Sequence, residues 1–432
     1  MRNRILTQSI EAVMLARSPA QLLLDLTLIS KSNSNFTYTP LIIDSLKINQ
    51  DFAHSYTDSI IISFEIASAD YANIQDNIQN LMAVLTFTSV DSIGRVVYTP
   101  APHKLTYRAT IVNPKDVRRQ LSDVASRSLP DTTIELRLIE QTIYDLRHIE
   151  INGIYQTTTL AEVLTHLAQS FNFKTLHLVP PDNTHVYDHI IIPPSKGFDE
   201  VFTYLQSTYG VYMKGLNFYG SGGILYIYPP YETKPVFPQT CVVYQADDGA
   251  FAGASSFHKT TGSTTEIVVN RESQSQDLTI SAGENKGTAS MFLRSSALVD
   301  GVVYVDPTTG PQYQSDVAAT LRLQQPRLAQ INAHNSSYVK ATDNPFSMAT
   351  SLAAGQALML KADWAHAIPL LLQPGCAVRY SYDHNGAQLS QTGILEGAQY
   401  SLHRNARGSF GIIYVCSGSL MFRLQPNSAK TA

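Results

Sequence analysis

The sequence predicts a mainly β, α+β protein in which two β-rich regions flank a small module of helices and strands. Runs of alternating apolar and polar residues recur through the first 150 residues and again from residue 370. Between them, residues 157–231 change to helical spacing and then to a glycine-joined hairpin. Hydrophobic residues make up 44% of the 432-residue chain and charged residues 15%, so the chain is globular and not disordered.

Residues 1–150 are predicted to form a β-rich domain that begins with a short helix at residues 5–15. Apolar and polar residues alternate at Leu22–Ile29 and at Ile60–Ile66, which indicates half-buried strands. A second short helix is expected at Lys115–Ser122, after Pro114. The other strand-like runs are 46–48, 81–90, 95–98, 105–111 and 134–143. Many short strands separated by turn signals are typical of a barrel or a sandwich.

Residues 151–235 are predicted to form the α+β module, and its two helices are the clearest elements in the chain. The first helix carries an apolar stripe from Leu160 to Phe171, and Thr159 followed by Glu162 is a capping-box pattern at its start. A second stripe begins at Phe198 and closes at Gly210, where a helix can end in the left-handed region.

Strands separate and follow these helices. His189–Ile192 is strand-like, and Pro193 and Pro194 separate it from the second helix. Beyond that helix, two runs rich in β-branched and aromatic residues are joined by Gly220-Ser221-Gly222-Gly223, which predicts a hairpin of Val211–Tyr219 with Ile224–Tyr228. The module is therefore helix, strand, helix, hairpin.

Residues 236–432 are predicted to form a second β domain with long loops and a helical insertion. The helical candidates are residues 317–334, interrupted by Pro326, and residues 351–361. From Leu370 the pattern is strand, turn and strand, with Pro374-Gly375 as the turn and Asn385-Gly386 as a hairpin turn. The other strand candidates are 236–244, 267–270, 278–281, 302–305, 400–404, 411–415 and 419–424.

Residues 370–424 alone supply too few strands to close a barrel comfortably. We therefore expect four earlier segments to pair with them in one second β domain: 241–244, 267–270, 278–281 and 302–305. Residues 249–265 are rich in Gly, Ser, Thr and Ala, and are expected to be a flexible loop within that domain. The α+β module should then lie at the periphery.

Charge and cysteine content exclude several classes of protein. The net charge is −4 and no basic run exceeds Arg118-Arg119, which disfavours a sequence-independent grip on nucleic acid. Cys241, Cys376 and Cys416 form no C-x-x-C pair and are expected to be free, buried thiols, although Cys376 and Cys416 could meet in one β domain. We expect no signal peptide and no membrane insertion, because no apolar run approaches ~20 residues.

Four groups of residues are candidate sites. His185, Asp188 and His189 could ligate a metal, but a solvated loop is favoured, and Asp247-Asp248 before a glycine is typical of a turn. A lytic site would need two carboxylates facing across a cleft, and its candidates are Glu135, Glu140, Asp145 and Glu150. The aromatic residues could form a sugar platform, but a module core with a Tyr-rich subunit contact is simpler; they are Tyr204, Tyr209, Tyr212, Phe218, Tyr219, Tyr226, Tyr228 and Tyr231.

No G-x-S-x-G, H-E-x-x-H, P-loop, Rossmann or EF-hand pattern occurs in the sequence. We therefore assign no catalytic, cofactor-binding or metal residue and expect no enzyme activity.

The run from Phe198 to Pro230 resembles the hub protein of contractile phage tails. In that family a helix ends in a Tyr-Gly-x-Tyr turn, here Tyr209–Tyr212, and a hairpin ends in Tyr-x-x-Pro, here Tyr226–Pro229. The pattern Leu-x-Pro-Gly-x-x-Val at Leu372–Val378 also recurs there, although Cys376 replaces a polar residue. The resemblance is strongest over residues 150–235, weaker over 20–150 and 370–425, and nearly absent between.

The resemblance implies a structural baseplate hub with two tube-like β domains per chain. Three copies would form a pseudo-sixfold ring that joins the sixfold tail tube to the threefold spike and leaves a channel for DNA. The implied partners are the tail tube protein, the tail spike protein and other baseplate or wedge proteins, in a virion assembled in the host cytoplasm. A DNA conduit should not hold DNA tightly, so we expect a neutral or acidic lumen.

Two other functions stay open at this point. One is a receptor- or carbohydrate-binding β protein of a virion, and the other is a peptidoglycan hydrolase. A hub from a flexible-tailed phage or from a phage-derived injection machine would have a similar sequence.

Overall fold

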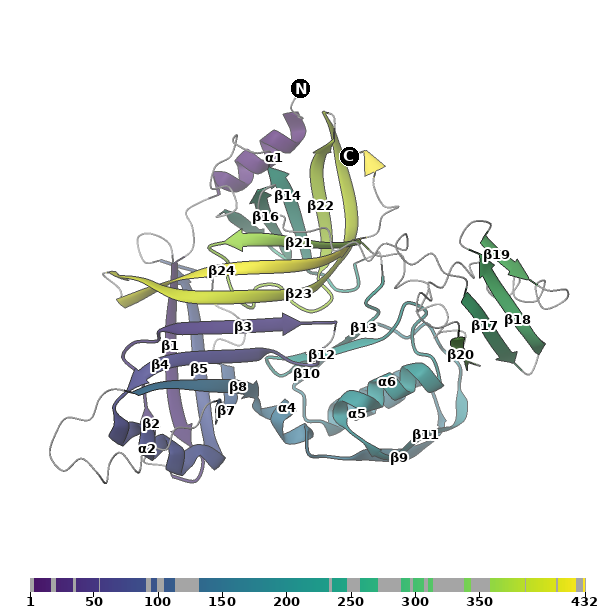
Figure 1. Cartoon of the computed structure of the whole chain (residues 1–432), viewed down its shortest axis with the longest axis horizontal. Coiled ribbons are helices and arrows are strands. Elements are labelled where there is room, and N and C mark those ends of the chain that lie inside the picture. The colour runs from purple at the N-terminus through teal and green to yellow at the C-terminus, as the bar shows by residue number, and fades with distance from the viewer. Residues whose placement is uncertain are drawn as a thin grey trace.

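The computed structural model describes residues 4–16, 21–33, 36–53, 55–90, 95–98, 105–112, 132–232, 235–246, 257–270, 289–295, 298–306, 310–313, 338–342, 358–384, 386–408, 411–424 and 430–431. The fold is α+β and mainly β, as the sequence predicts (Figure 1).

Eight strands close a barrel from the two ends of the chain. Their hydrogen-bonded order is β1-β5-β7-β8-β4-β3-β23-β24, and β24 returns to β1 where Leu22 pairs with Tyr414. The strands are β1 (Gln21–Ser30), β3 (Ser45–Asp51), β4 (Ser59–Ile66), β5 (Leu81–Val90), β7 (Leu105–Ile111), β8 (Thr132–Glu140), β23 (Ala387–Gly408) and β24 (Gly411–Leu424). A ring of about eight strands leaves an interior that side chains can fill.

The side chains at every second position of the strands fill this interior. In β1 and β4 every second residue is buried, so that Leu26, Leu28, Ile60 and Ile62 lie in one apolar core. Burying each such side chain contributes ~1.5–3 kcal/mol. The periodicity read from the sequence therefore sets which face of each strand points inward.

A second sheet continues from the same two long strands. Its hydrogen-bonded order is β15-β16-β14-β22-β23, with β21 added on the far side of β24. The new strands are β14 (Thr240–Ala246), β15 (His258–Thr261), β16 (Thr264–Asn270), β21 (Leu358–Ala365) and β22 (Ala377–His384). One face of β14 and β16 joins the barrel core through Val243 and Ile267, and α1 (Arg4–Met14) covers the other face with Ile10 and Val13.

The strand β23 belongs to both parts. Its first half pairs with β22, whereas residues 397–403 pair with β3. Strand β24 follows β23 along most of its length, with register shifts between Leu395 and Gly397 and between Arg404 and Ala406. Figure 1 shows this pair crossing the molecule between the barrel and the second sheet.

The α+β module lies beside the barrel as three layers (Figure 1). A two-stranded ribbon and a three-stranded sheet, β10-β13-β12, enclose the two helices around one core. The elements are β9 (Ile151–Thr158), α5 (Leu160–Ser170), β10 (Thr175–Leu178), β11 (Tyr187–Lys196), α6 (Phe198–Thr208), β12 (Asn217–Ser221) and β13 (Ile224–Tyr228). The expected capping box is present, because Thr159 and Glu162 each accept a hydrogen bond from the other's backbone N–H.

The remaining elements are short or form a sheet of their own. A separate sheet has the order β19-β18-β17-β20. The elements are β2 (Thr37–Tyr38), α2 (Ser68–Asn77), η1 (Ile78–Asn80), β6 (Val96–Tyr98), α4 (Gln141–Leu146), β17 (Ala289–Ser295), β18 (Leu298–Asp306), β19 (Gly310–Tyr313), β20 (Tyr338–Thr342) and β25 (Lys430–Thr431).

The predicted completion of the second sheet is confirmed for two segments and wrong for a third. Residues 241–244, in β14, pair with β22, and residues 267–270, in β16, pair with β14. Residues 302–305 instead lie in β18, within the separate sheet. Residues 278–281 fall outside the described part of the chain. The domain boundaries at residues 150 and 235 stay a prediction.

Several local predictions are corrected. Residues 258–261 and 264–265 are strand and not loop, because β15 and β16 form a hairpin about Gly262, whose φ is +60°. Residues 358–361 are strand and not helix, since β21 pairs along its length with β24. Pro193 and Pro194 lie within β11, where a register shift between Ile192 and Lys196 accommodates them.

Three more boundaries differ from the prediction. Strand β8 ends at Glu140 and α4 follows, residues 370–373 form no strand, and the hairpin's first strand begins at Asn217. The sequence pattern does not predict the helices α2 and η1 or the strands β2, β9, β10, β17, β19, β20 and β25. The helical candidates 115–122 and 317–334 and the pair Asp247-Asp248 lie outside the described residues.

The cysteines are three free, buried thiols, as predicted. Burial raises the pKa of Cys241 to about 12 and also raises the pKa values of Cys376 and Cys416. In the part of the chain that the structure describes, no helix is long and apolar enough to cross a membrane.

The pairing of β23 with β24 predicts a strict requirement for glycine at residue 393. A Cβ there would collide with the Arg423 carbonyl oxygen, so Gly393→Ala should lower the free energy of unfolding by about 2 kcal/mol or more. Gly153→Ala is the matched control, because its Cβ would meet only the Tyr155 ring at 3.8 Å. Urea unfolding of both variants measures the difference, and equal stability would contradict the described pairing.

Candidate functional site

Buried carboxylates concentrate where the barrel meets the α+β module. Asp58 lies immediately before β4 and is only 5% exposed. Its Oδ1 accepts hydrogen bonds from Gln50 Nε2 at 2.8 Å and from the Tyr219 hydroxyl at 2.9 Å. Its Oδ2 accepts one from Ser221 Oγ at 2.6 Å. A single carboxylate of the barrel therefore holds two side chains of the module strand β12.

Glu140, the last residue of β8, holds the turn that follows β12. Its Oε1 accepts a hydrogen bond from the Gly223 backbone N–H at 2.7 Å. Gly222 and Gly223 have φ of +63° and +81°, a region that glycine adopts without strain. The glycine turn thus presents its N–H groups to a carboxylate from the barrel.

Backbone contacts join the same surfaces. Gly220 donates its N–H to the Tyr56 carbonyl at 2.9 Å, and Thr57 and Gly220 form an isolated parallel bridge. A Cβ at Gly220 would lie 2.7 Å from Ile143 Cδ1 and 3.2 Å from the Phe173 ring. Only glycine at residue 220 therefore allows β12 to lie this close to Ile143 of α4 and to Phe173.

Aromatic rings surround these polar contacts. The Tyr56 ring stacks on Phe218 at 6.4 Å and meets Phe198 edge-on at 5.8 Å. Arg147 donates from Nε to the Tyr56 hydroxyl at 3.1 Å. Phe52 and Tyr219 pack edge to face at 4.8 Å. The loop between β3 and β4 is therefore anchored to the module at several points.

Burial governs the protonation of both acids. It raises the pKa of Asp58, and the hydrogen bonds from Ser221, Gln50 and Tyr219 offset part of the rise. It also raises the pKa of Glu140 to about 7; the Asp58 charge adds to this rise, while the turn N–H groups and Lys174 oppose it. Burial and both acids raise the pKa of Tyr107. At neutral pH the Glu140 carboxyl group is therefore partly protonated.

Two cavities adjoin the junction. One of about 200 Å³ is lined by Tyr107, Glu140, Lys174 and the glycine turn. The other, of about 290 Å³, lies between β23, β24 and the module, beside the Arg423–Glu396 ion pair. The Arg423 guanidinium also lies 4.6 Å from the centre of the Tyr231 ring. Protein groups themselves bind the oxygens of Asp58, so the arrangement is suited to clamping two parts of the chain together.

The carboxylates singled out in the sequence do not gather. Glu140 is buried, whereas Asp145 and Glu150 are exposed and Glu135 is half-buried. The acid whose charge acts on Glu140 at the junction is Asp58, which the sequence pattern did not single out. The Tyr219 and Ser221 donors are 161 and 163 residues away from Asp58, so no local pattern could have found it.

The histidine group is not brought to a shared centre with another ligand. His185 packs edge-on against Tyr187 at 4.7 Å, and His189 lies within β11. Within the described residues, no group of three or more His, Cys, Asp or Glu side chains could hold a metal ion.

Tyr212 and Phe218 are buried in the module core that the sequence predicts, whereas Tyr219 is buried in the barrel core. Tyr212, Tyr219, Tyr226 and Tyr228 are each at most 2% exposed. Phe218 is also buried and stacks on Phe202 at 4.4 Å. The half-buried Tyr204 and Tyr209 pack against the same core. The suggested contact of these tyrosines with another subunit stays a prediction.

One family comparison bears on this region. Residues 86–227 match the family described as bacteriophage PBS1 gene 109 protein. The matched segment runs from β5 to β13 and so contains Glu140, the glycine turn and most of the module. The resemblance to phage proteins drawn from the sequence is thereby confirmed over this segment. No curated protein matches the chain.

Several solved structures are similar to the chain at low identity. A tail protein from Neisseria meningitidis MC58 is 12% identical, with a TM-score of 0.46 over 93% of this chain and 96% of that one. The 43 kDa tail protein of prophage MuSo2 from Shewanella oneidensis is 11% identical, with a TM-score of 0.45 over 94% and 97%. A chain of the Francisella PdpA-VgrG complex is 10% identical, with a TM-score of 0.47 over 96% and 55%.

Glu140→Gln should make the free energy of unfolding less dependent on pH, because the glutamine side chain cannot lose a proton as the pH rises. The folded-state pKa of about 7 exceeds the ordinary value of 4.5, so the folded chain binds this proton more tightly than the unfolded chain. The stability that this bound proton contributes is complete below pH 4.5 and is lost as the pH rises through about 7. Between about pH 5 and pH 8, the variant should gain about 1–3 kcal/mol relative to the wild type in urea unfolding. Glu150→Gln, which removes an exposed carboxyl group, is the control; identical pH profiles for all three proteins would contradict the prediction.

Removing the Asp58 carboxylate should loosen the junction. Asp58→Ala leaves the donors of Gln50, Tyr219 and Ser221 buried without their acceptor, and should lower the free energy of unfolding by about 2–5 kcal/mol. Ser221→Ala removes one donor and should cost about 1–2 kcal/mol. Thermal and urea unfolding measure both effects. A smaller loss for Asp58→Ala than for Ser221→Ala would show that this carboxylate does not join the two parts.

Proposed function

We propose that the protein is a structural component of a bacteriophage tail, and specifically a baseplate hub. The observation that carries the proposal is the pair of β units built around β23 and β24 within one chain. The match of residues 86–227 to a bacteriophage protein family supports a phage tail protein. The turn and hairpin motifs of residues 198–230, which resemble those of tail hubs, support the hub role.

Three copies with two β units each would place six units around one axis. Such a ring would face a sixfold tail tube on one side and a threefold spike on the other, since a threefold assembly with six similar units satisfies both symmetries. The partners under this proposal are the tail tube protein, the spike protein and other baseplate proteins. The chain then acts as a symmetry adaptor within the virion.

The junction fits this mechanical role. Asp58, Glu140 and the Thr57–Gly220 bridge fix the module on the barrel, so that a force on one part is transmitted to the other. Tyr212 and Phe218 are buried in the module core, and Tyr219 is buried in the barrel core. This burial supports a structural part over a sugar-binding platform.

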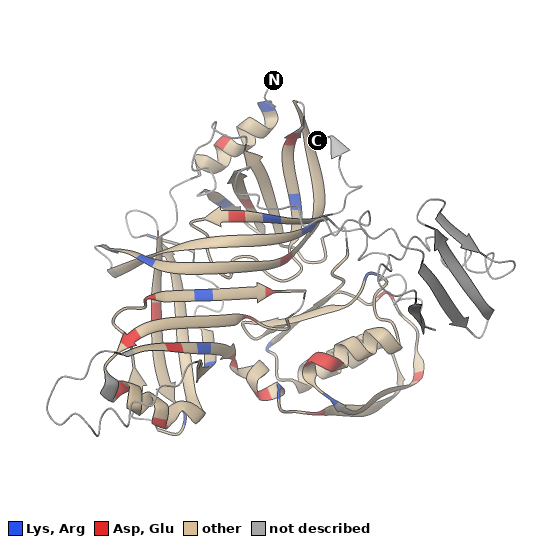
Figure 2. Cartoon of the chain, in the orientation of Figure 1, with Lys and Arg blue, Asp and Glu red and all other residues tan. Residues whose placement is uncertain are grey.

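Charge is consistent with a conduit that does not hold DNA. The net charge is −4. Figure 2 shows acidic and basic positions interspersed along the barrel strands, and no row of basic residues follows any strand drawn in colour there. Tight DNA binding requires several Lys or Arg groups on one face. The proposed lumen is therefore neutral or acidic.

The oligomeric state tests the proposal. Light scattering of the purified protein at micromolar concentration should give three times the chain mass of 47.6 kDa, and electron micrographs should show a ring. The same ring should bind no duplex DNA at physiological salt. A stable monomer that forms no ring, even with its tail tube protein added, would overturn the hub assignment.

A further inference from the structure

The cavity of about 290 Å³ beside the junction has walls from both parts of the chain. Its lining comes from the loop after β3, from α6, from the segments on either side of the β12–β13 hairpin, and from β23 and β24. Apolar side chains of this lining include Phe52, Leu216, Ile394 and Leu395. The volume is close to the lower end of the range of ligand cavities in proteins, which are mostly apolar and contain a few polar groups that orient the ligand.

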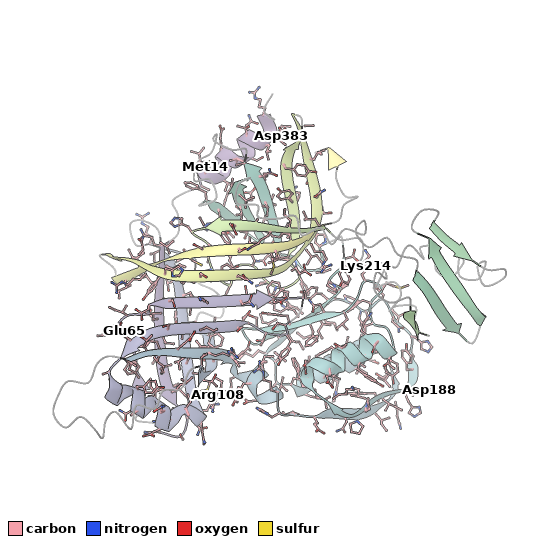
Figure 3. The ribbon with its side chains drawn as sticks, in the orientation of Figure 1. Met14, Glu65, Arg108, Asp188, Lys214 and Asp383 are labelled. Carbon is pink, nitrogen blue, oxygen red and sulfur yellow. The ribbon has the colours of Figure 1, made fainter. Side chains whose placement is uncertain are left out.

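One ion pair supplies the charge in this cavity. Among the described residues that line it, Arg423 and Glu396 alone are charged, and they pair through Arg423 Nη2 and Glu396 Oε1. Glu396 is 8% exposed, and the Arg423 guanidinium lies 4.6 Å from the centre of the Tyr231 ring. The nearby Lys214, labelled in Figure 3, is likewise paired with Glu232 at 2.8 Å. Because the charges cancel in each pair, the cavity has no net charge.

A β-bulge places Glu396 in the cavity wall. Leu395 lies opposite Phe422 and Gly397 lies opposite Met421, so Glu396 is an extra residue of β23 at a register shift. Bulges change the direction of a side chain and are common beside functional sites. Burying an acid among apolar neighbours is costly unless its oxygens are bound. The local change of register therefore puts a carboxylate where a regular strand would place an apolar residue.

The ion pair leaves hydrogen-bonding groups unused on both of its members. Glu396 Oε2 is buried and has no hydrogen-bond partner among the described residues. A guanidinium has more N–H donors than one bond uses, and Arg423 makes no other hydrogen bond to the part of the chain that the structure describes. One unused acceptor and one set of unused donors therefore belong to the same pair.

The two amide side chains of the lining are already bound within the protein. Gln206 Oε1 accepts the Tyr212 N–H at 3.1 Å, and Gln206 Nε2 donates to the Tyr212 carbonyl at 2.8 Å. Asn217 Nδ2 donates to the Tyr228 hydroxyl at 3.1 Å, and Asn217 Oδ1 accepts the Phe218 N–H at 3.0 Å. These amides fix the walls, so the ion pair is the polar group that remains to orient a ligand.

We propose that this cavity binds a neutral carboxamide group attached to an apolar body. The carboxamide N–H donates to Glu396 Oε2, and its carbonyl oxygen accepts a hydrogen bond from Arg423. A carboxamide carries a donor and an acceptor side by side, as the unused groups of the ion pair require. The apolar body lies against Phe52 and Leu216. A charged group is disfavoured, because a neutral ion pair offers no net charge to offset its desolvation.

The proposal does not depend on the hub assignment. It follows from the cavity, the bulge and the incomplete ion pair. The same carboxamide chemistry is found in free small molecules and in the Asn and Gln side chains of other protein chains. The experiment below separates these two sources.

Fluorine NMR of a small probe tests the site in the full-length protein. The probe is 4-fluorobenzamide, which has both the N–H donor and the carbonyl acceptor. Methyl 4-fluorobenzoate keeps the carbonyl and lacks the N–H, and 4-fluorobenzoate is charged. Titration should show saturable binding of the amide, with about tenfold weaker binding of the ester and of the anion.

Variants of the wall locate the binding. In Glu396→Gln, Arg423 should attract the new amide oxygen, so that an NH2 group replaces Oε2; the preference for the amide over the ester should then disappear. Ser207→Trp, at an exposed lining position of α6, should block both probes. Thr208→Trp is the matched control, since Thr208 is also exposed on α6 but does not line the cavity, and it should bind as the wild type does. Circular dichroism checks that each variant is folded.

Competition identifies the source of the carboxamide. Displacement of the probe by a capped Gly-Gln-Gly peptide, but not by capped Gly-Met-Gly, assigns the site to a side chain of another protein, whereas no displacement by either peptide assigns it to a free molecule. Four results would overturn the proposal: no saturable binding of 4-fluorobenzamide, equal binding of amide and ester by the wild type, an unchanged preference in Glu396→Gln, or binding that persists in Ser207→Trp.

Discussion

Two long strands, β23 and β24, determine how the rest of the chain is arranged. They complete the ring of barrel strands on one side and support β22 and β21 on the other. A half-closed barrel would leave two rows of unpaired backbone groups, and these strands remove both rows. The core is continuous across the two parts for the same reason, since side chains of β23 contribute to both.

The α+β module is joined to this framework by charge and by close backbone approach. Burying two carboxyl groups is costly unless hydrogen bonds compensate for the lost water. Asp58 receives donors from both parts, and Glu140 receives the N–H of a glycine turn. Because each acid bridges barrel and module, neither part can shift without exposing unsatisfied groups to a low-dielectric interior. Such a junction favours one relative position.

Periodicity in the sequence predicts most of the strands and helices, but it does not predict how they pair. The stripes from Leu160 and Phe198 become α5 and α6, and alternation at Leu22 and Ile60 becomes β1 and β4. The role of Asp58 could not be predicted, since its partners lie far away in sequence. Residues 358–361 belong to the helical candidate 351–361, and the pairing of β21 with β24, which the sequence does not show, makes them strand.

The closing contact of the barrel has a consequence for biosynthesis. Leu22 pairs with Tyr414, and the Ile43 N–H donates to the Tyr414 hydroxyl across 371 residues of sequence. A ribosome therefore releases the first barrel strands long before the strands that seal them have been made. Contacts of such separation form slowly, and the open strands are exposed to neighbouring chains in the meantime. Productive folding of this protein is thus a post-translational event that depends on an intact C-terminal hairpin.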